Sequence, residues 1–381
     1  MRTVVFLLAL AGCGEVPITS SVQIDVAISR SDFATACKGL TVEDEAIRLY
    51  TADQLLSWGE SPEANACVCA VLHDAATGKS DLALAKKLAG KKRDDLAVCL
   101  GEALGDKRTE GRGDLAKALA AIGAPKGSEI LASGLKSDEA LVRSASVVGL
   151  GGSEPHAAAI VELAQRDPDA SVRAAAAGVL YRWKGNEALA TGLVAVAKDA
   201  DPTVRSAVGR SLLGVERPEA DAAWCALLED PDAAVRLEAV KASENVRRES
   251  VSTCLGALLS RDEPNADVRQ MAIYELTVMR TKYAGRALCD AIGPYTARYV
   301  VDAIPVPEGP LDIAYAQNAV DFETSFACYE AAMKAPGLSC GGKFYLTYWS
   351  NAMGGKRTAP KCPGLEIPGA MAPEAPAPPA Q

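Results

Sequence analysis

The sequence repeats one helix-face pattern five times, and this repeat constrains the fold more than any other feature. Each copy places a Val, then a small or branched residue four positions later, then in most copies a Leu after four more. The copies are Val142, Ser146, Leu150; Val172, Ala176, Leu180; Val204, Val208, Leu212; Val235, Ala239, Ser243; and Val268, Ala272, Leu276. Residues at i, i+4 and i+8 share one face of an α-helix, so each copy predicts a helix with an apolar stripe.

An Arg directly follows each of these Val residues, and the Arg residues set the period. They stand at positions 143, 173, 205, 236 and 269, which are 30, 32, 31 and 33 residues apart. This period is close to one helical hairpin, and one hairpin cannot bury its apolar face alone. The sequence therefore predicts stacked hairpins, an α-solenoid, with about seven or eight hairpins between residues 62 and 305.

The turns between the two helices of each hairpin carry Asp and Pro. Asp suits a helix N-cap and Pro suits the first helical turn. The strings Asp201-Pro202-Thr203-Val204-Arg205 and Asp230-Pro231 with Val235-Arg236 resemble the HEAT-like repeat family in its short bacterial, PBS-lyase-type form. The resemblance is strong over residues 127–280. It implies an all-α, right-handed α-solenoid of helical hairpins.

The repeated Arg residues invite two interpretations. We expect them to pair with turn carboxylates such as Asp169, Asp201 or Asp232 and so to stabilise the stack, because repeated positions in solenoids serve stacking first. A binding site for anions is the alternative.

The N-terminus has the features of a bacterial export signal. Met1-Arg2 precedes the apolar stretch Val4–Leu10, and Leu10-Ala11-Gly12-Cys13 resembles a lipobox. The resemblance implies a lipoprotein signal peptide over 1–12, a lipidated (palmitate-bearing) Cys13, and a membrane anchor through this lipid alone. Gly14, where an Asp would retain the protein at the inner membrane, favours the outer membrane of a bacterial cell envelope.

Residues 13–30 are expected to form the lipidated Cys and a tether. The alternation of Val22, Ile24, Val26 and Ile28 leaves a short strand open as well. No other stretch is apolar and long enough to span a bilayer.

Eleven cysteines in an exported chain indicate disulfides, and ten remain if Cys13 is lipidated. Spacings near one repeat favour Cys37–Cys67, Cys69–Cys99 and Cys225–Cys254. Cys289, Cys328, Cys340 and Cys362 supply two further bridges, among which we favour Cys328–Cys340. The net charge of −9 argues against a nucleic-acid partner, which would require a basic stripe.

The remaining segments are assigned by composition. Residues 31–126 are expected to form degenerate repeats, 127–304 the HEAT-like repeats, 305–365 a helical cap, and 366–381 a disordered Pro/Ala tail. The cap holds helices Val320–Lys334 and Lys343–Ala352, with Phe322, Phe326 and Tyr329 on one face. The aromatic residues of the cap, which include Tyr348 and Trp349, either cover the last hairpin or form a binding patch.

Catalytic patterns are missing from the sequence. It has two isolated histidines, His73 and His156, and lacks G-x-S-x-G, C-x-x-C and the His-Glu pairs with which HEAT-like hydroxylases hold iron. We therefore expect no cofactor, no metal site and no enzyme activity. A pocket joining either His to several carboxylates would favour a cryptic enzyme or a lyase-like subunit instead.

The sequence thus favours a lipid-anchored envelope solenoid that binds a protein partner as a scaffold or adaptor. A structural module of an envelope assembly is the alternative. Candidate partner-binding residues are the outward-facing ones on the second helices: Arg210, Glu238, Lys241 and Gln270. In HEAT-like repeats these helices usually line the concave side.

We predict that Cys13→Ser releases the protein from the membrane fraction, because the acylated thiol is its proposed anchor. Fractionation of cells that express the wild type and the variant checks this. Equal membrane association of the two forms would contradict the lipid anchor.

Overall fold

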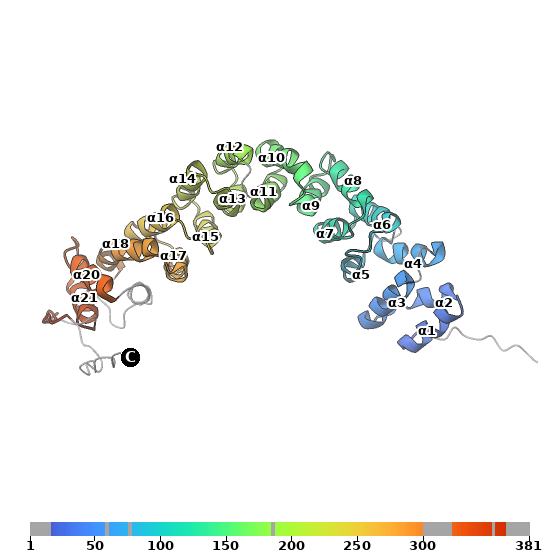
Figure 1. Ribbon diagram of the computed structural model, residues 1–381, viewed down its shortest axis with the longest axis horizontal. Helices are drawn as coiled ribbons and strands as arrows, with labels where there is room; N and C mark the ends of the chain where they lie inside the picture. The colour runs from blue at the N-terminus through green and yellow to red at the C-terminus, as the bar shows by residue number, and fades with distance from the viewer. Residues whose placement is uncertain are drawn as a thin grey trace, which may run out of the picture. The chain divides into compact units, whose positions relative to one another are not determined.

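The computed structural model describes residues 17–57, 61–74, 78–183, 187–299, 322–352 and 355–362 (Figure 1). All regular secondary structure in these ranges is helical, as the repeat predicts. None of the described helices combines the length and apolar character needed to cross a membrane. The proposed signal peptide, Cys13 and residues 366–381 lie outside the described residues.

The chain forms two compact units, residues 1–150 and 151–381, so the boundary falls inside the segment expected to hold the HEAT-like repeats. The helices of the first unit are α1 (Ser21–Ser29), α2 (Phe33–Lys38), α3 (Glu45–Ser57), α4 (Pro62–Leu72), α5 (Leu82–Lys87), α6 (Asp94–Gly105), α7 (Arg112–Ala121), α8 (Pro125–Gly134) and α9 (Ala140–Leu150). They stack in two layers: α2, α4, α6 and α8 contact in succession, and so do α3, α5, α7 and α9.

The structure corrects the expectation for residues 13–30. Val22–Ile28 forms neither a strand nor a tether but part of helix α1, which packs on α2 and α3. Ile24 and Ile28 lie four residues apart on one helical face and are buried, whereas Val22 and Val26 are exposed. A capping box at Ser20 and Gln23 starts this helix, because the two side chains satisfy backbone groups of its first turn.

The second unit repeats the same two-layer arrangement. Its helices are η1 (Glu154–His156), α10 (Ala157–Arg166), α11 (Ala170–Val179), η2 (Leu180–Arg182), α12 (Glu187–Val196), α13 (Pro202–Gly214), α14 (Pro218–Leu227), α15 (Ala233–Ala242), α16 (Glu249–Ser260), α17 (Ala266–Met279), α18 (Lys282–Tyr299), α20 (Phe322–Ala332) and α21 (Cys340–Ala352). Helices α10, α12, α14, α16 and α18 form the first layer, and α11, α13, α15 and α17 form the second (Figure 1). The second layer carries the repeated stripe, whose members Val204, Val208 and Leu212 are fully buried.

Three of the repeated Arg residues, Arg173, Arg205 and Arg236, join successive hairpins. Arg173 donates to both carboxylate oxygens of Asp199 at 2.8 and 3.0 Å, and Arg205 does the same to Asp230 at 2.6 and 2.9 Å. Arg236 reaches Glu263 with two bonds of 2.7 Å. Each of the three also donates to the backbone carbonyl six residues before it, so one guanidinium ties its own turn to the next.

These contacts confirm a stacking role for Arg173, Arg205 and Arg236 and pairing with turn carboxylates, but the three Asp residues named as examples were wrong. Asp169, Asp201 and Asp232 cap the second helices, where each accepts the backbone N–H two residues later. The partners Asp199, Asp230 and Glu263 instead lie in the turn that follows the next hairpin's first helix. Burial alone would raise the pKa of Asp199, but hydrogen bonds from Arg173 and from the Asp201 backbone lower it.

Five disulfides cross-link the described residues, and three join the cysteines paired by spacing. They are Cys37–Cys67, Cys69–Cys99 and Cys225–Cys254, with Cα atoms 5.4 to 5.7 Å apart. The expected Cys328–Cys340 bridge is wrong. Cys328 pairs with Cys289 on α18, and Cys340 pairs with Cys362. The cap helix α20 is therefore tied to the last repeat rather than to α21.

We predict that Arg236→Ala lowers the free energy of unfolding by about 3–5 kcal/mol, because it leaves the buried Glu263 carboxylate without its cation. The matched control is Lys241→Ala, which breaks the surface Lys241–Glu238 pair of the same helix and should cost less than about 1 kcal/mol. Denaturant unfolding of both variants with disulfides intact measures the difference. Equal losses would show that the Arg236 link adds no more than an exposed pair.

Candidate functional site

Three of the four candidate partner-binding residues are exposed on the second layer. Arg210 on α13, Glu238 on α15 and Gln270 on α17 are exposed, and Lys241 is half-buried. Glu238 and Lys241 bind each other at 2.8 Å, so these two charges partly neutralise each other. Successive helices of this layer contact, which places the four residues on neighbouring elements. Their partner-binding role stays a prediction.

Two exposed apolar residues on α17 extend this surface. Tyr274 is 59% exposed and Val278 is 37% exposed, at i+4 and i+8 from Gln270. Tyr274 stands five residues after Arg269, the same offset that separates Arg210 from Arg205 and Lys241 from Arg236. We call Arg210, Glu238, Lys241, Gln270, Tyr274 and Val278 the variable face, because its residues differ between repeats. Tyr274 was not predicted from the sequence, although its offset from the repeated Arg distinguishes it.

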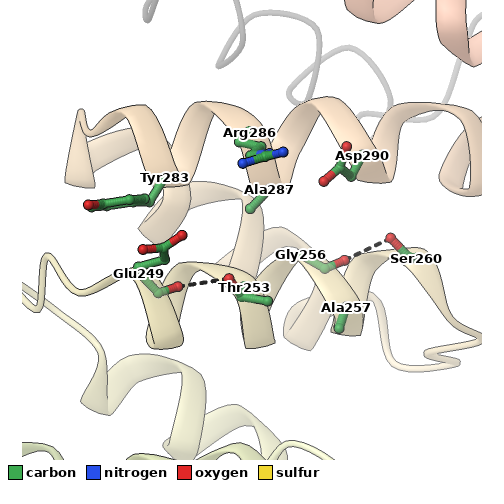
Figure 2. Close-up of a pocket in the computed structure, with 9 residues that line it drawn as sticks. All are labelled: Glu249, Thr253, Gly256, Ala257, Ser260, Tyr283, Arg286, Ala287 and Asp290. Atoms are coloured by element: carbon green, nitrogen blue, oxygen red, sulfur yellow. Dashed lines mark hydrogen bonds between the residues drawn. The ribbon is translucent and has the colours of Figure 1, made fainter.

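A groove of about 430 Å³ lies between α16 and α18 in the first layer (Figure 2). Its floor is Gly256 and Ala287, where a Cβ added to Gly256 would lie 2.8 Å from the Ala287 Cβ. Glu249 and Thr253 line one wall, and Tyr283, Arg286 and Asp290 line the other. These small residues let the two helices approach closely at the floor of the groove.

The groove has little chemistry to offer beyond binding. Its two aliphatic hydroxyls, from Thr253 and Ser260, donate to carbonyls of their own helix, at Glu249 and Gly256 (Figure 2). Neither hydroxyl bonds to a side-chain base, which nucleophilic catalysis needs. The mixed charges of its walls suit a polar surface contact.

Neither histidine lies among several carboxylates in a described pocket. The His73 Nε2 atom lies 3.1 Å from the Oδ2 atom of Asp106. That carboxylate also binds the Arg108 guanidinium, and hydrogen bonds from Arg108 and then from His73 keep the pKa of Asp106 well below its usual range. His156 ends η1 and precedes α10. In the described ranges, no group of three or more His, Cys, Asp or Glu side chains is placed to hold a metal ion.

The aromatic residues of the cap divide between core and surface. Tyr329 is fully buried and Tyr345 is buried, whereas Tyr348 is 44% exposed and packs edge-on against Trp349. The buried pair supports capping of the last hairpin. The side chains of Phe322 and Phe326 lie outside the described residues.

Glu275 on α17 departs from the pattern of its neighbours. It is 3% exposed, and its Oε2 atom has no hydrogen-bond partner among the described residues. The same position relative to the repeated Arg holds Val179, Ser211 and Ala242 in the preceding repeats. Burial, with the charge of Glu244 as a smaller cause, raises the pKa of Glu275 to about 7.

The comparisons with known proteins find similar solved structures but no matching family model. No family model matches the sequence, and no curated protein matches it. Among solved structures, the chain is similar to the Escherichia coli protein YibA, with 21% identity, a TM-score of 0.43, and coverage of 63% of this chain and 94% of that one. It is also similar to importin beta, with 11% identity, a TM-score of 0.48 and coverage of 85% and 55%. Human deoxyhypusine hydroxylase aligns at 20% identity and a TM-score of 0.27, over 67% and 98%.

We predict that stability falls as the pH rises through the range set by Glu275. The folded state binds this proton up to about pH 7, whereas an unfolded Glu releases it near 4.3, so ionisation destabilises the fold as pH rises between these values. Between pH 5 and pH 8 the free energy of unfolding should drop by about 2–3 kcal/mol.

Glu275→Gln should abolish this drop and stabilise the protein at pH 8. The matched control is Glu238→Gln, an exposed Glu on the adjacent helix, which should leave the pH dependence as in the wild type. Denaturant unfolding at both pH values measures it. An unchanged pH slope in Glu275→Gln would contradict the assignment.

Proposed function

We propose that this chain is an exported, lipid-anchored cell-envelope protein that binds a protein partner through the variable face and catalyses no reaction. Its anchor is the lipid on Cys13. Gly14, which stands where an Asp would retain the protein at the inner membrane, favours the outer membrane.

One observation carries the binding proposal: the repeated residues are used inside the fold, and the variable ones are left outside. The apolar stripe is buried, and Arg173, Arg205 and Arg236 bind neighbouring turns. A row of unlike side chains remains at the surface of the second layer: Arg210 and Tyr274 are exposed, and Lys241 is half-buried. Such a surface discriminates partners by charge pattern, and a Tyr supplies a rigid contact of the kind common at interface centres.

The absence of catalysis is proposed from the chemistry of the described sites. The Thr253 and Ser260 hydroxyls of the α16–α18 groove are bonded to their own helix, and His73 meets a carboxylate that an Arg already holds. Both arrangements use their polar groups for structure.

We predict that photo-crosslinking residues placed at positions 210, 241 and 274 capture a partner in intact cells. The matched controls are positions 222, 226 and 257, where exposed alanines lie on first-layer helices α14 and α16. Binding of the captured partner should weaken about tenfold or more between low and high salt, because rim charges are screened beyond about 10 Å at 0.1 M salt.

Crosslinks confined to the control positions, or to positions 348 and 349, would place the partner site on the first layer or on the cap. Binding that is unaffected by salt would contradict recognition by charge.

A further inference from the structure

A second cavity, of about 380 Å³, opens where the second-layer helices end. Its walls come from the C-terminal parts of η2, α13 and α15 and from the chain leading into α16. Its polar lining consists of Tyr181, Arg210, Arg247, Arg248, Glu216, Glu244 and Asn245. Arg210 also belongs to the variable face, so the cavity and that face are continuous.

Two guanidinium groups meet on one phenol ring at this cavity. The Arg182 and Arg210 guanidinium carbons lie 5.8 and 5.6 Å from the centre of the Tyr181 ring. A cation over an aromatic face is held by the ring quadrupole, which orients it without neutralising it. A hydrogen bond from Arg182, with the charges of Arg182 and Arg210, lowers the pKa of the Tyr181 phenol, as expected where positive charge is concentrated.

The cations of this cavity differ in whether a carboxylate already holds them. Arg248 is held by Asp221 at 2.6 Å and by the Leu213 carbonyl at 3.0 Å. Arg210 and Arg247 are exposed and form no ion pair with any residue in the described ranges. This contrasts with Arg173, Arg205 and Arg236, which bind carboxylates of the next turn.

Backbone contacts beside the cavity hold Tyr181, the residue on whose ring the Arg182 and Arg210 guanidinium groups lie. The Tyr181 N–H donates to the Ser211 hydroxyl at 2.9 Å, which ties η2 to the next second-layer helix. Asn245 and Glu216, at the ends of α15 and α13, have left-handed backbone (φ 64° and 56°), which turns the chain sharply beside the cavity. The cavity is therefore built by turns whose geometry does not depend on a ligand.

We propose that this cavity binds the acidic side chains of a peptide segment in the partner protein. Arg presents a planar fork of donors that fits a carboxylate with two parallel hydrogen bonds, and Arg210 and Arg247 are the forks without such a partner. This inference rests on the proposed function, because that function makes the ligand a segment of a protein. Glu216 and Glu244 line the same cavity, so they limit the affinity for acidic segments.

The test is fluorescence anisotropy on the full chain with three labelled, end-blocked peptides: hexaglutamate, hexaglutamine and hexalysine. Hexaglutamate should bind at least about tenfold more tightly than the other two. Arg210→Gln should weaken hexaglutamate binding by about tenfold, and Arg210→Lys by a smaller factor, because Lys keeps the charge but loses the fork. Glu244→Gln should strengthen it, because that change removes a like charge from the cavity wall.

The matched control is Arg286→Gln, which removes an exposed Arg from the α16–α18 groove and should leave hexaglutamate binding unchanged. Arg210, Glu244 and Arg286 are all exposed, so these variants keep the fold. Equal binding by wild type and Arg210→Gln, or tighter binding of hexalysine than of hexaglutamate, would overturn the proposal. Full displacement of hexaglutamate by 1 mM inorganic phosphate at constant ionic strength would also overturn it, because the site would then be a general anion site.

The outcome separates this proposal from the proposed function. Hexaglutamate binding that depends on Arg210, together with no crosslinked partner at positions 210, 241 and 274, supports the cavity and contradicts the partner-binding face. Crosslinks at those positions without peptide binding support the face and contradict the cavity.

Discussion

The links from Arg173, Arg205 and Arg236 to the next turn set the register of the stack over these repeats. A guanidinium has five donors in a fixed plane, so it can hold its own turn's carbonyl and the next turn's carboxylate only when the hairpins stand at one offset. The acceptor is saturated as well: Asp230 binds Arg205 and also accepts the Asp232 N–H. A buried ion pair adds little net stability after desolvation. The apolar stripe supplies the stability, and the Arg link selects the arrangement.

Because the buried stripe and the Arg links hold the hairpins together, the outward-facing residues are free to vary. Stripe and link together fix each hairpin, so no structural demand falls on the position five residues after the repeated Arg, which holds Arg210, Lys241 and Tyr274 in turn. Glu275 is the exception inside the stack. It puts an ionisable group where preceding repeats place Val179, Ser211 and Ala242. Local violations of a repeat rule concentrate near functional sites in natural proteins, and Glu275 interacts with Glu244 on the wall of the second cavity.

The sequence predicted the features that depend on its periodicity. It did not predict contacts that depend on how one hairpin is placed against the next. Helix phase predicted the buried stripe, and spacing near one repeat predicted Cys225–Cys254, because equivalent positions of stacked hairpins face each other. Cys328 has no equivalent position in a repeat, so spacing could not identify Cys289 as its partner. The carboxylate partners of Arg173, Arg205 and Arg236 lie 25 to 27 residues later in the sequence, on the next hairpin. The phase of one helix does not predict its contacts with the next hairpin. The alternation of Val and Ile over residues 22–28 is compatible with a strand. The same residues also place Ile24 and Ile28 at i and i+4, which suits one face of a helix. The segment forms a helix, which packs this face on α2 and α3.

The same links bear on how the second cavity could hold a flexible acidic segment. Disulfide Cys225–Cys254 ties α14 to α16 in the first layer, and Arg236 ties the turns at the start of the second-layer helices. At the opposite ends of those helices, Ser211 holds the Tyr181 backbone and Asp221 holds Arg248. Each hairpin around the cavity is thus fixed at several separate points. A site that needs no rearrangement loses less free energy to ordering when it binds. A few charge-assisted bonds, from Arg210 and Arg247, then suffice for a selective contact with modest affinity.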